Sequence, residues 1–438
     1  MNKKIIAILC VVILAIAGIA TVLILNKGGD KLAYDDRGRL MIFGNANNDD
    51  RIDGDDVEYL EAIIAGDKEK TPLADTNCDG VVDAEDVKAV QGMIELNEKI
   101  ASGKPYTKTE VHYLYPYAGD ELVGQLIYPL EHVAVVGTNV ALTLKLIKAT
   151  DKIECRMGGV VDPTLFSDII AKSEISDSVF QADFERTMQF VAKNGPLDAL
   201  ITLDSQSYVP NHQNFEDAGI KVVRVSASDG LESISGALTL GYLLGLAEES
   251  QEYVEFCDDV LGHIASKVNG IKDDKRVTSL SITMSNYISG LSSDFYAATE
   301  MAGSKNLADW DATTKRFNIG DEWLLNEKYD ADFLIHMRSM GYGEVDPDEM
   351  WETYSIYFKA MGAYTDGGYY LVNGNMPVAL RILYMAHIFY PDLLTEEYLT
   401  EKHQYCIDNF LENLAEQNYK VADGTFIISM DMISEGSI

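Results

Sequence analysis

Two short acidic segments, 30 residues apart, carry the residue types and spacing that bind calcium. The second segment places oxygen ligands at alternate positions of a twelve-residue loop: Asp75, Asn77, Asp79, the carbonyl of Val81, Asp83 and Asp86. Calcium takes six to eight oxygens at about 2.3–2.6 Å, so alternate residues of a curled loop must point inward. Gly80 at position 6 permits the sharp turn that this loop needs.

The first segment repeats this spacing with weaker ligands. Its oxygens come from Asn45, Asn47, Asp49, the carbonyl of Arg51, Asp53 and Asp56. Asp50 stands where the second loop has its glycine, and Asn45 stands where the second loop has an acid. We therefore expect two calcium sites, of which the second is the stronger.

Each loop runs into one apolar-periodic segment, at residues 57–65 and 87–94, which predicts one helix after each loop. Each loop also ends in Asp, where an ordinary EF-hand has Glu. A duplicated calcium loop with a single helix per copy resembles a dockerin module. The resemblance implies a cohesin domain as partner. The alternative interpretation is a solvated acidic linker.

Length and charge limit the class of protein. The chain has 438 residues, enough for two or three domains, and 70 acidic against 35 basic residues give a net charge of −35. Such a surface repels nucleic acid, so we expect no nucleic-acid partner. Of the five cysteines, only Cys155, Cys257 and Cys406 lie in the large domain, where they allow at most one disulfide.

The N-terminal part carries a long apolar segment. Residues 5–25 contain no charge and would reach roughly 30 Å as a helix, which matches the core of a bilayer. The two lysines before it and the acidic residues after it orient the bulk of the chain outside the cell. We expect a single-pass anchor in the cell membrane, and a cleaved signal peptide is the competing interpretation.

From residue 131 onward, short apolar runs alternate with helical patterns. The first set predicts strands at 132–136, 152–155, 198–203 and 221–225, and helices at 139–149, 180–192 and 212–218. A second set predicts strands at 277–284, 333–336 and 369–372, and helices at 295–302, 322–328, 347–358, 376–390 and 396–418. Alternation of this kind requires crossover connections and therefore parallel sheets covered on both faces.

The expected fold class is α/β, with two Rossmann-like lobes joined by a long backbone helix. A small all-α calcium module and a transmembrane helix precede them. The boundaries are 1–29 for the anchor or signal, 30–44 for a spacer, 45–96 for the calcium module, 97–108 for a linker and 109–438 for the two-lobed domain. The domain divides into an N-lobe (109–230), the helix (231–270) and a C-lobe (271–438). In open sheets, ligands bind beyond the carboxyl ends of strands, so the cleft between the lobes is the expected site.

Five segments of this domain carry a family resemblance: "VAVVGTNVALTLKLIKATDKI", "LDALITLDSQSYVPNHQNFEDAGIKVVRV", "AATEMAGSKNLADW", "EWLLNEKYDADFLIHMRS" and "NMPVALRILYMAHIFYPDLL". In this order they resemble the solute-binding proteins of ABC importers, of the helical-backbone type that captures iron-siderophores, haem and cobalamin. The resemblance implies capture of a metal chelate and delivery to an ABC permease through a Glu on each lobe. The chain departs from the family at Val140 and Ala141, where a Thr-Glu pair is usual, and Glu174 is the alternative docking carboxylate.

Residues just beyond the predicted strands are the candidate ligand contacts: Thr138, Asn139, Arg156, Tyr208, Tyr287, Arg338 and Tyr342. Arginine suits the carboxylates or hydroxamates of a chelate, and tyrosine rings cover its apolar periphery. The alternative for each arginine is an ordinary surface ion pair.

Other functions find less support in the sequence. The seven histidines show no spacing that would favour a bare transition-metal ion, and the usual catalytic motifs are absent, so we predict a protein that is not an enzyme. Two alternatives stay open. One is a dockerin-bearing extracellular enzyme, and the other is a structural adaptor of a cohesin-dependent assembly.

Overall fold

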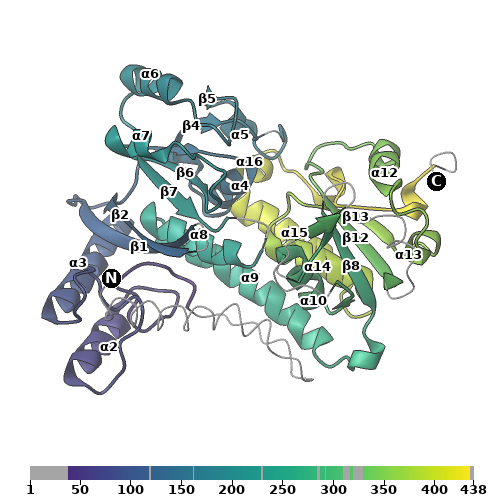
Figure 1. Ribbon diagram of the computed structural model, residues 1–438, viewed down its shortest axis with the longest axis horizontal. Helices are drawn as coiled ribbons and strands as arrows, with labels where there is room; N and C mark the ends of the chain where they lie inside the picture. The colour runs from purple at the N-terminus through teal and green to yellow at the C-terminus, as the bar shows by residue number, and fades with distance from the viewer. Residues whose placement is uncertain are drawn as a thin grey trace.

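Two α/β lobes lie side by side, with a smaller N-terminal unit packed against the first (Figure 1). The computed structural model describes residues 38–117, 120–160, 162–227, 230–283, 287–291, 293–308, 316–318 and 329–434. The predicted helix at 322–328 lies outside these residues.

The N-lobe is a five-stranded parallel sheet in the order β5-β4-β3-β6-β7. Its strands are β3 (Val133–Val135), β4 (Ile153–Met157), β5 (Ser173–Ser176), β6 (Ala199–Leu203) and β7 (Lys221–Val225), and its helices are α4 (Thr138–Leu146), α5 (Ser167–Ile170), α6 (Phe184–Asn194) and α7 (His212–Asp217). The central strands are buried on both faces, which explains their nearly continuous apolar sequences.

The C-lobe has a mixed sheet in the order β11-β9-β8-β12-β13-β14, and β10 pairs with β8. The strands are β8 (Thr278–Thr283), β9 (Tyr287–Ser289), β10 (Lys305–Asn306), β11 (Arg316–Asn318), β12 (Phe333–Arg338), β13 (Tyr369–Asn373) and β14 (Ile427–Ser429). The helices are α10 (Asp294–Met301), α12 (Pro347–Ser355), α13 (Gly362–Thr365), α14 (Val378–Phe389), α15 (Glu396–Phe410) and α16 (Glu412–Glu416). The central strands β8, β12 and β13 are parallel.

Two helices, rather than the single one predicted, connect the lobes. They are α8 (Glu232–Leu243) and α9 (Ala247–Val268), and α9 leads from the N-lobe to the C-lobe (Figure 1). Gly245 lies between them with φ of 72°, a conformation that favours glycine. Gly241 permits the close approach of α9, because a Cβ there would lie 2.2 Å from the Cβ of Ser250.

The N-terminal unit contains α2 (Gly54–Ala65), α3 (Ala84–Ala101) and an antiparallel ribbon of β1 (Thr109–Tyr117) and β2 (Asp120–Tyr128). Asp53 and Asp83 begin the two helices as N-caps, each within a capping box. The ribbon was not predicted, although Val111 and Tyr113 alternate as its buried residues.

The N-terminal unit is fastened to the N-lobe and α9. The ring of Tyr128 stacks on Tyr242 of α8 with a centroid separation of 5.1 Å, and its hydroxyl donates to Asn97 of α3. Arg39 bridges the two parts, because its Nε donates to Asp50 (2.9 Å) and its Nη1 to Asp258 of α9 (2.8 Å). Residues of α3, the ribbon and α8 thus share one hydrophobic core.

The predicted single-pass membrane localisation requires correction. Between residues 38 and 434, within the ranges given above, no helix is both long enough and apolar enough to cross a bilayer. The predicted anchor at residues 5–25 lies outside those ranges.

Candidate functional site between the lobes

The carboxyl ends of strands from both lobes meet at a small cavity. Thr138 and Asn139, which follow β3, line it from the N-lobe, and residues 374–377, which follow β13, line it from the C-lobe. Tyr253 of α9 and Arg381 of α14 also line the cavity. Its volume is about 20 Å³, room for about one water molecule. The cavity is therefore nearly closed.

A buried carboxylate joins the two lobes directly. Asp162 accepts hydrogen bonds from the backbone N–H of Thr164 (3.0 Å) and Leu165 (3.1 Å) in its own lobe. It also accepts one from the backbone N–H of Tyr342 in the C-lobe (2.9 Å). Asn413 of α16 adds donors to the carbonyls of the same N-lobe loop. These contacts join the loop after β4 to the C-lobe.

The N-lobe candidates take up different environments. The Thr138 hydroxyl donates to the carbonyl of Gly159 and so connects the loops after β3 and β4. Arg156 forms an ion pair with Glu174, the alternative docking carboxylate. Tyr208 is half-buried, and its ring lies 5.2 Å from that of Phe180, which is 55% exposed. The roles of Thr138, Arg156 and Tyr208 as ligand contacts stay predictions.

Arg338 is the C-lobe candidate best placed to meet an anion. It ends β12, and its guanidinium carbon lies 3.9 Å from the centroid of the Tyr354 ring. Its Nη2 donates to the Tyr354 hydroxyl (3.0 Å), whereas its Nε is buried without a hydrogen-bond partner among the described residues. The tyrosine thus holds the arginine side chain in place.

The other two C-lobe candidates, Tyr342 and Tyr287, lie in other surroundings than Arg338. Tyr342 is fully buried, and its ring packs against His403, Tyr419 and Phe426 in the hydrophobic core. Tyr287 begins β9, the strand between β8 and β11. Of the seven predicted ligand contacts, Thr138 and Asn139 line the interlobe cavity and the other five do not.

Sequence reasoning missed three features of the cleft: Asp162, Arg381 and the loop 374–377. The loop 374–377 could have been predicted from the sequence, because it directly follows the predicted strand 369–372. Asp162 and Arg381 carried no comparable signal, because their positions depend on how the lobes meet.

The two acidic loops share one conformation in the N-terminal unit. In the first, Asp56 accepts from the backbone N–H of Asn47 (3.1 Å), and Asp86 accepts equivalently from Asn77 (3.2 Å) in the second. Position 4 has φ of 58° in both loops. Asp56 and Asp86 are both fully buried. The sequence repeat is thus also a structural repeat.

The loops differ at position 6. Gly80 has φ of 97° and donates its N–H to Asp75 (2.9 Å). Asp50 instead directs its carboxylate to Arg39.

Burial raises the pKa of Asp56 to about 7. Within the described ranges no three His, Cys, Asp or Glu side chains are already arranged as a metal centre. The loop carboxylates accept backbone N–H groups instead.

No protein family and no curated protein matches the sequence. Solved structures do resemble it. A TroA-like periplasmic binding protein FepB from Veillonella parvula is 16% identical with a TM-score of 0.52, covering 69% of this chain and 95% of its own. The CeuE nickel-histidine complex of Helicobacter pylori is 13% identical, with a TM-score of 0.52, 70% of this chain covered and 99% of its own. The molybdate-binding MolA of Haemophilus influenzae is 13% identical, with a TM-score of 0.50, 65% covered and 93% of its own.

These comparisons define the class of fold. The chain has the two-lobed α/β fold of the periplasmic solute-binding proteins of ABC transporters. At these identities the likeness concerns the fold alone. It agrees with the predicted α/β class and with the family resemblance of the large domain.

Proposed function

We propose that this protein captures a metal chelate, of the iron-siderophore kind, and presents it to an ABC permease without a chemical step. The observation that carries the proposal is the meeting of strand ends from both lobes at one cavity beside α8 and α9. The fold neighbours bind small metal-containing solutes, nickel-histidine and molybdate, according to their names. Haem, cobalamin and a bare metal ion are the alternative ligands. Titration of the purified protein with ferric siderophores tests the proposal.

The charge at the cleft favours an anionic ligand. Arg338 stands at the carboxyl end of β12, where the Tyr354 ring and hydroxyl hold its guanidinium. A guanidinium can bind the carboxylate or hydroxamate oxygens of a chelate through two parallel hydrogen bonds. Arg156 is a weaker candidate, because its charge is already balanced by Glu174.

Replacing Arg338 is expected to weaken chelate capture. Arg338→Ala should raise the dissociation constant for an anionic ferric chelate about 10- to 100-fold, the loss of a hydrogen bond to a charged group. Arg276→Ala is the matched control, because Arg276 precedes β8 at the opposite, amino end of the same sheet. Unchanged affinity in Arg338→Ala would remove this residue from the site.

We propose in addition that loops 45–56 and 75–86 bind calcium, and that a cohesin domain is the partner of this unit. Support comes from the shared loop conformation and from two buried acids at position 12. Calcium would be held by the loop oxygens named from the sequence. The glycine turn and the acid at position 1 favour the second loop, whereas Asp50 of the first is committed to Arg39.

Calorimetric titration with calcium is expected to show one tighter and one weaker site. Asp86→Ala should abolish the tighter one, because it removes the carboxylate at position 12. Asp67→Ala, which alters an exposed acid just after α2, is the control and should leave both sites intact. Two sites of equal affinity would contradict this ranking.

A further inference from the structure

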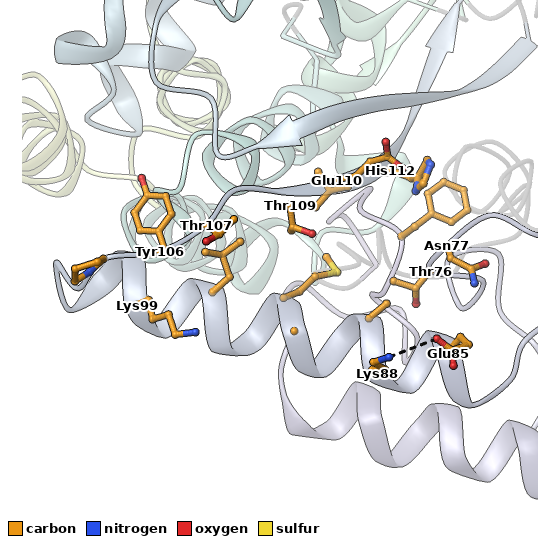
Figure 2. Close-up of a pocket in the computed structure, with 17 residues that line it drawn as sticks. Thr76, Asn77, Glu85, Lys88, Lys99, Tyr106, Thr107, Thr109, Glu110 and His112 are labelled. Atoms are coloured by element: carbon orange, nitrogen blue, oxygen red, sulfur yellow. Dashed lines mark ion pairs between the residues drawn. The ribbon is translucent and has the colours of Figure 1, made fainter.

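A second groove of the described chain lies outside the interlobe cleft. It has a volume of about 650 Å³ and separates helix α3 from the segment 105–112, which leads into β1. Figure 2 shows Lys88 and Lys99 on the helix, and Thr107, Thr109 and Glu110 on the segment across the groove. Asn77 of the second calcium loop also lines the groove, and the chelate proposal does not use it.

One wall of the groove is a strand edge with which no described residue pairs. Further along β1 the same edge is covered, because the N–H of Phe43 donates to His112 (3.0 Å) and that of Leu114 to Met41 (2.8 Å). In an antiparallel ribbon the backbone groups of successive residues point alternately to the two sides. Glu110 therefore turns its N–H and C=O away from β2, into the groove.

The chain itself shows how a strand adds to this edge. Residues 41–43 run antiparallel to β1 beside residues 112–114. The added segment then stops, because Gly44 has φ of 108° and its N–H donates to Leu73 instead. If this segment continued in the same direction, it would run beside residues 107–110, in the space that the groove occupies.

The dimensions suit a short extended peptide. The six residues from Thr107 to His112, of which the last four belong to β1, span roughly 17 Å at about 3.4 Å per residue. The facing stretch of α3, from Glu85 to Lys99, has a similar length of roughly 21 Å at 1.5 Å per residue. A guest of five or six extended residues would therefore fill the groove from end to end.

Gly92 keeps the helical wall of the groove open. A glycine inside a helix costs about 1 kcal/mol relative to alanine, so it needs a reason. Packing within the chain supplies none, because a Cβ at Gly92 would meet no atom within 4 Å. Gly92 lines the groove, where a side chain would occupy the space of a guest.

We propose that this groove binds an extended peptide segment of a partner protein, added antiparallel to β1 as a further strand. Main-chain hydrogen bonds to the N–H and C=O of Glu110 would hold the guest, whereas His112 is already paired with Phe43. Its alternate side chains would be apolar and face Met93 and Leu96 on the groove floor. The guest would thus extend the short strand that residues 41–43 form beside β1.

The test uses the hexapeptide acetyl-Thr-Val-Thr-Val-Thr-Val-amide as a probe on the whole chain. Calorimetry should show binding at tens to hundreds of micromolar, and amide exchange at Glu110 should slow at least several-fold. A probe with alternate amides N-methylated cannot donate those hydrogen bonds and should not bind. Gly92→Leu should weaken binding at least 10-fold. Gly262→Leu is the matched control, since Gly262 is also an exposed helical glycine, on α9, with no atom near its Cβ.

Three results would overturn the proposal. They are absence of probe binding, equal binding of the methylated probe, and equal binding by the Gly92 variant. A dimer of the protein that Gly92→Leu converts to monomer would also overturn it, in favour of a contact between copies. The exchange measurement needs no variant, so it decides the matter even if Gly92→Leu were to misfold.

Discussion

Acidification from pH 6.5 toward 3 is expected to destabilise the folded protein by about 1.4 kcal/mol per pH unit through His403 alone. His403 of α15 is fully buried, and burial lowers the pKa of its imidazole from 6.5 to about 3. Its Nδ1 lies 2.8 Å from the Tyr384 hydroxyl, and its Nε2 lies 3.4 Å from that of Tyr342. The Phe426 ring covers it at a centroid distance of 4.3 Å.

The sign of this effect follows from where the proton binds. Above pH 6.5 the imidazole is neutral in both the folded and the unfolded chain, and stability is unaffected. Between pH 6.5 and about 3 the unfolded chain takes up a proton that the folded chain excludes, so the free energy of unfolding falls. Below about pH 3 both states are protonated, and the loss is complete.

A variant isolates His403 from the many carboxylates that also titrate in this range. His403→Gln keeps one hydrogen-bonding group for the neighbouring tyrosines and removes the titration. Denaturant unfolding of both proteins at pH 7, 6, 5 and 4 gives the difference in stability at each pH. The advantage of the native protein should shrink by about 1.4 kcal/mol per unit. Parallel pH profiles would show that His403 is protonated in the folded state.

Asp162→Ala is expected to cost about 2–6 kcal/mol, from the two buried donors at Leu165 and Tyr342, and to loosen the contact between the lobes. The carboxylate is 6% exposed and accepts the backbone N–H groups of Thr164, Leu165 and Tyr342. The alanine leaves these donors without an acceptor, and each buried unsatisfied group costs about 1–3 kcal/mol. Because Tyr342 belongs to the other lobe, its amide should also exchange faster with solvent.

The matched control is Asp183→Ala. Asp183 caps α6 by accepting from the backbone N–H of Arg186 in the same lobe, so its loss should cost only about 1 kcal/mol. It should leave exchange at Tyr342 unchanged. Urea unfolding and amide exchange measure both effects. Equal losses in the two variants, with unaltered exchange at Tyr342, would contradict a role for Asp162 between the lobes.

Much of the two lobes was predictable, because parallel strands covered on both faces have distinctive apolar runs. The pattern predicted a strand at 221–225, and β7 occupies Lys221–Val225. The ribbon of β1 and β2 was missed, because exposed apolar residues such as Val123 and Ile127 obscure its alternation. The division of the connecting helix follows from Gly241 and Gly245, whose role depends on the packing of α8 against α9.

The candidate site was predictable only where topology alone places residues. Thr138 and Asn139 line the interlobe cavity, because a loop after a parallel strand lies at the carboxyl edge of its sheet. The burial of Tyr342 depends on packing against α15 and could not be read from its position after β12. The ion pair of Arg156 with Glu174 depends on the neighbouring order of β4 and β5.

The most direct test of the account is a binding titration of the purified protein with ferric siderophores, haem and cobalamin. We expect one ligand class, an anionic ferric chelate, to bind at one site per chain with a dissociation constant of micromolar or below. The same titration of Arg338→Ala should show weaker binding. Failure of all three ligand classes to bind at micromolar concentrations would contradict the proposal that this cleft captures a metal chelate.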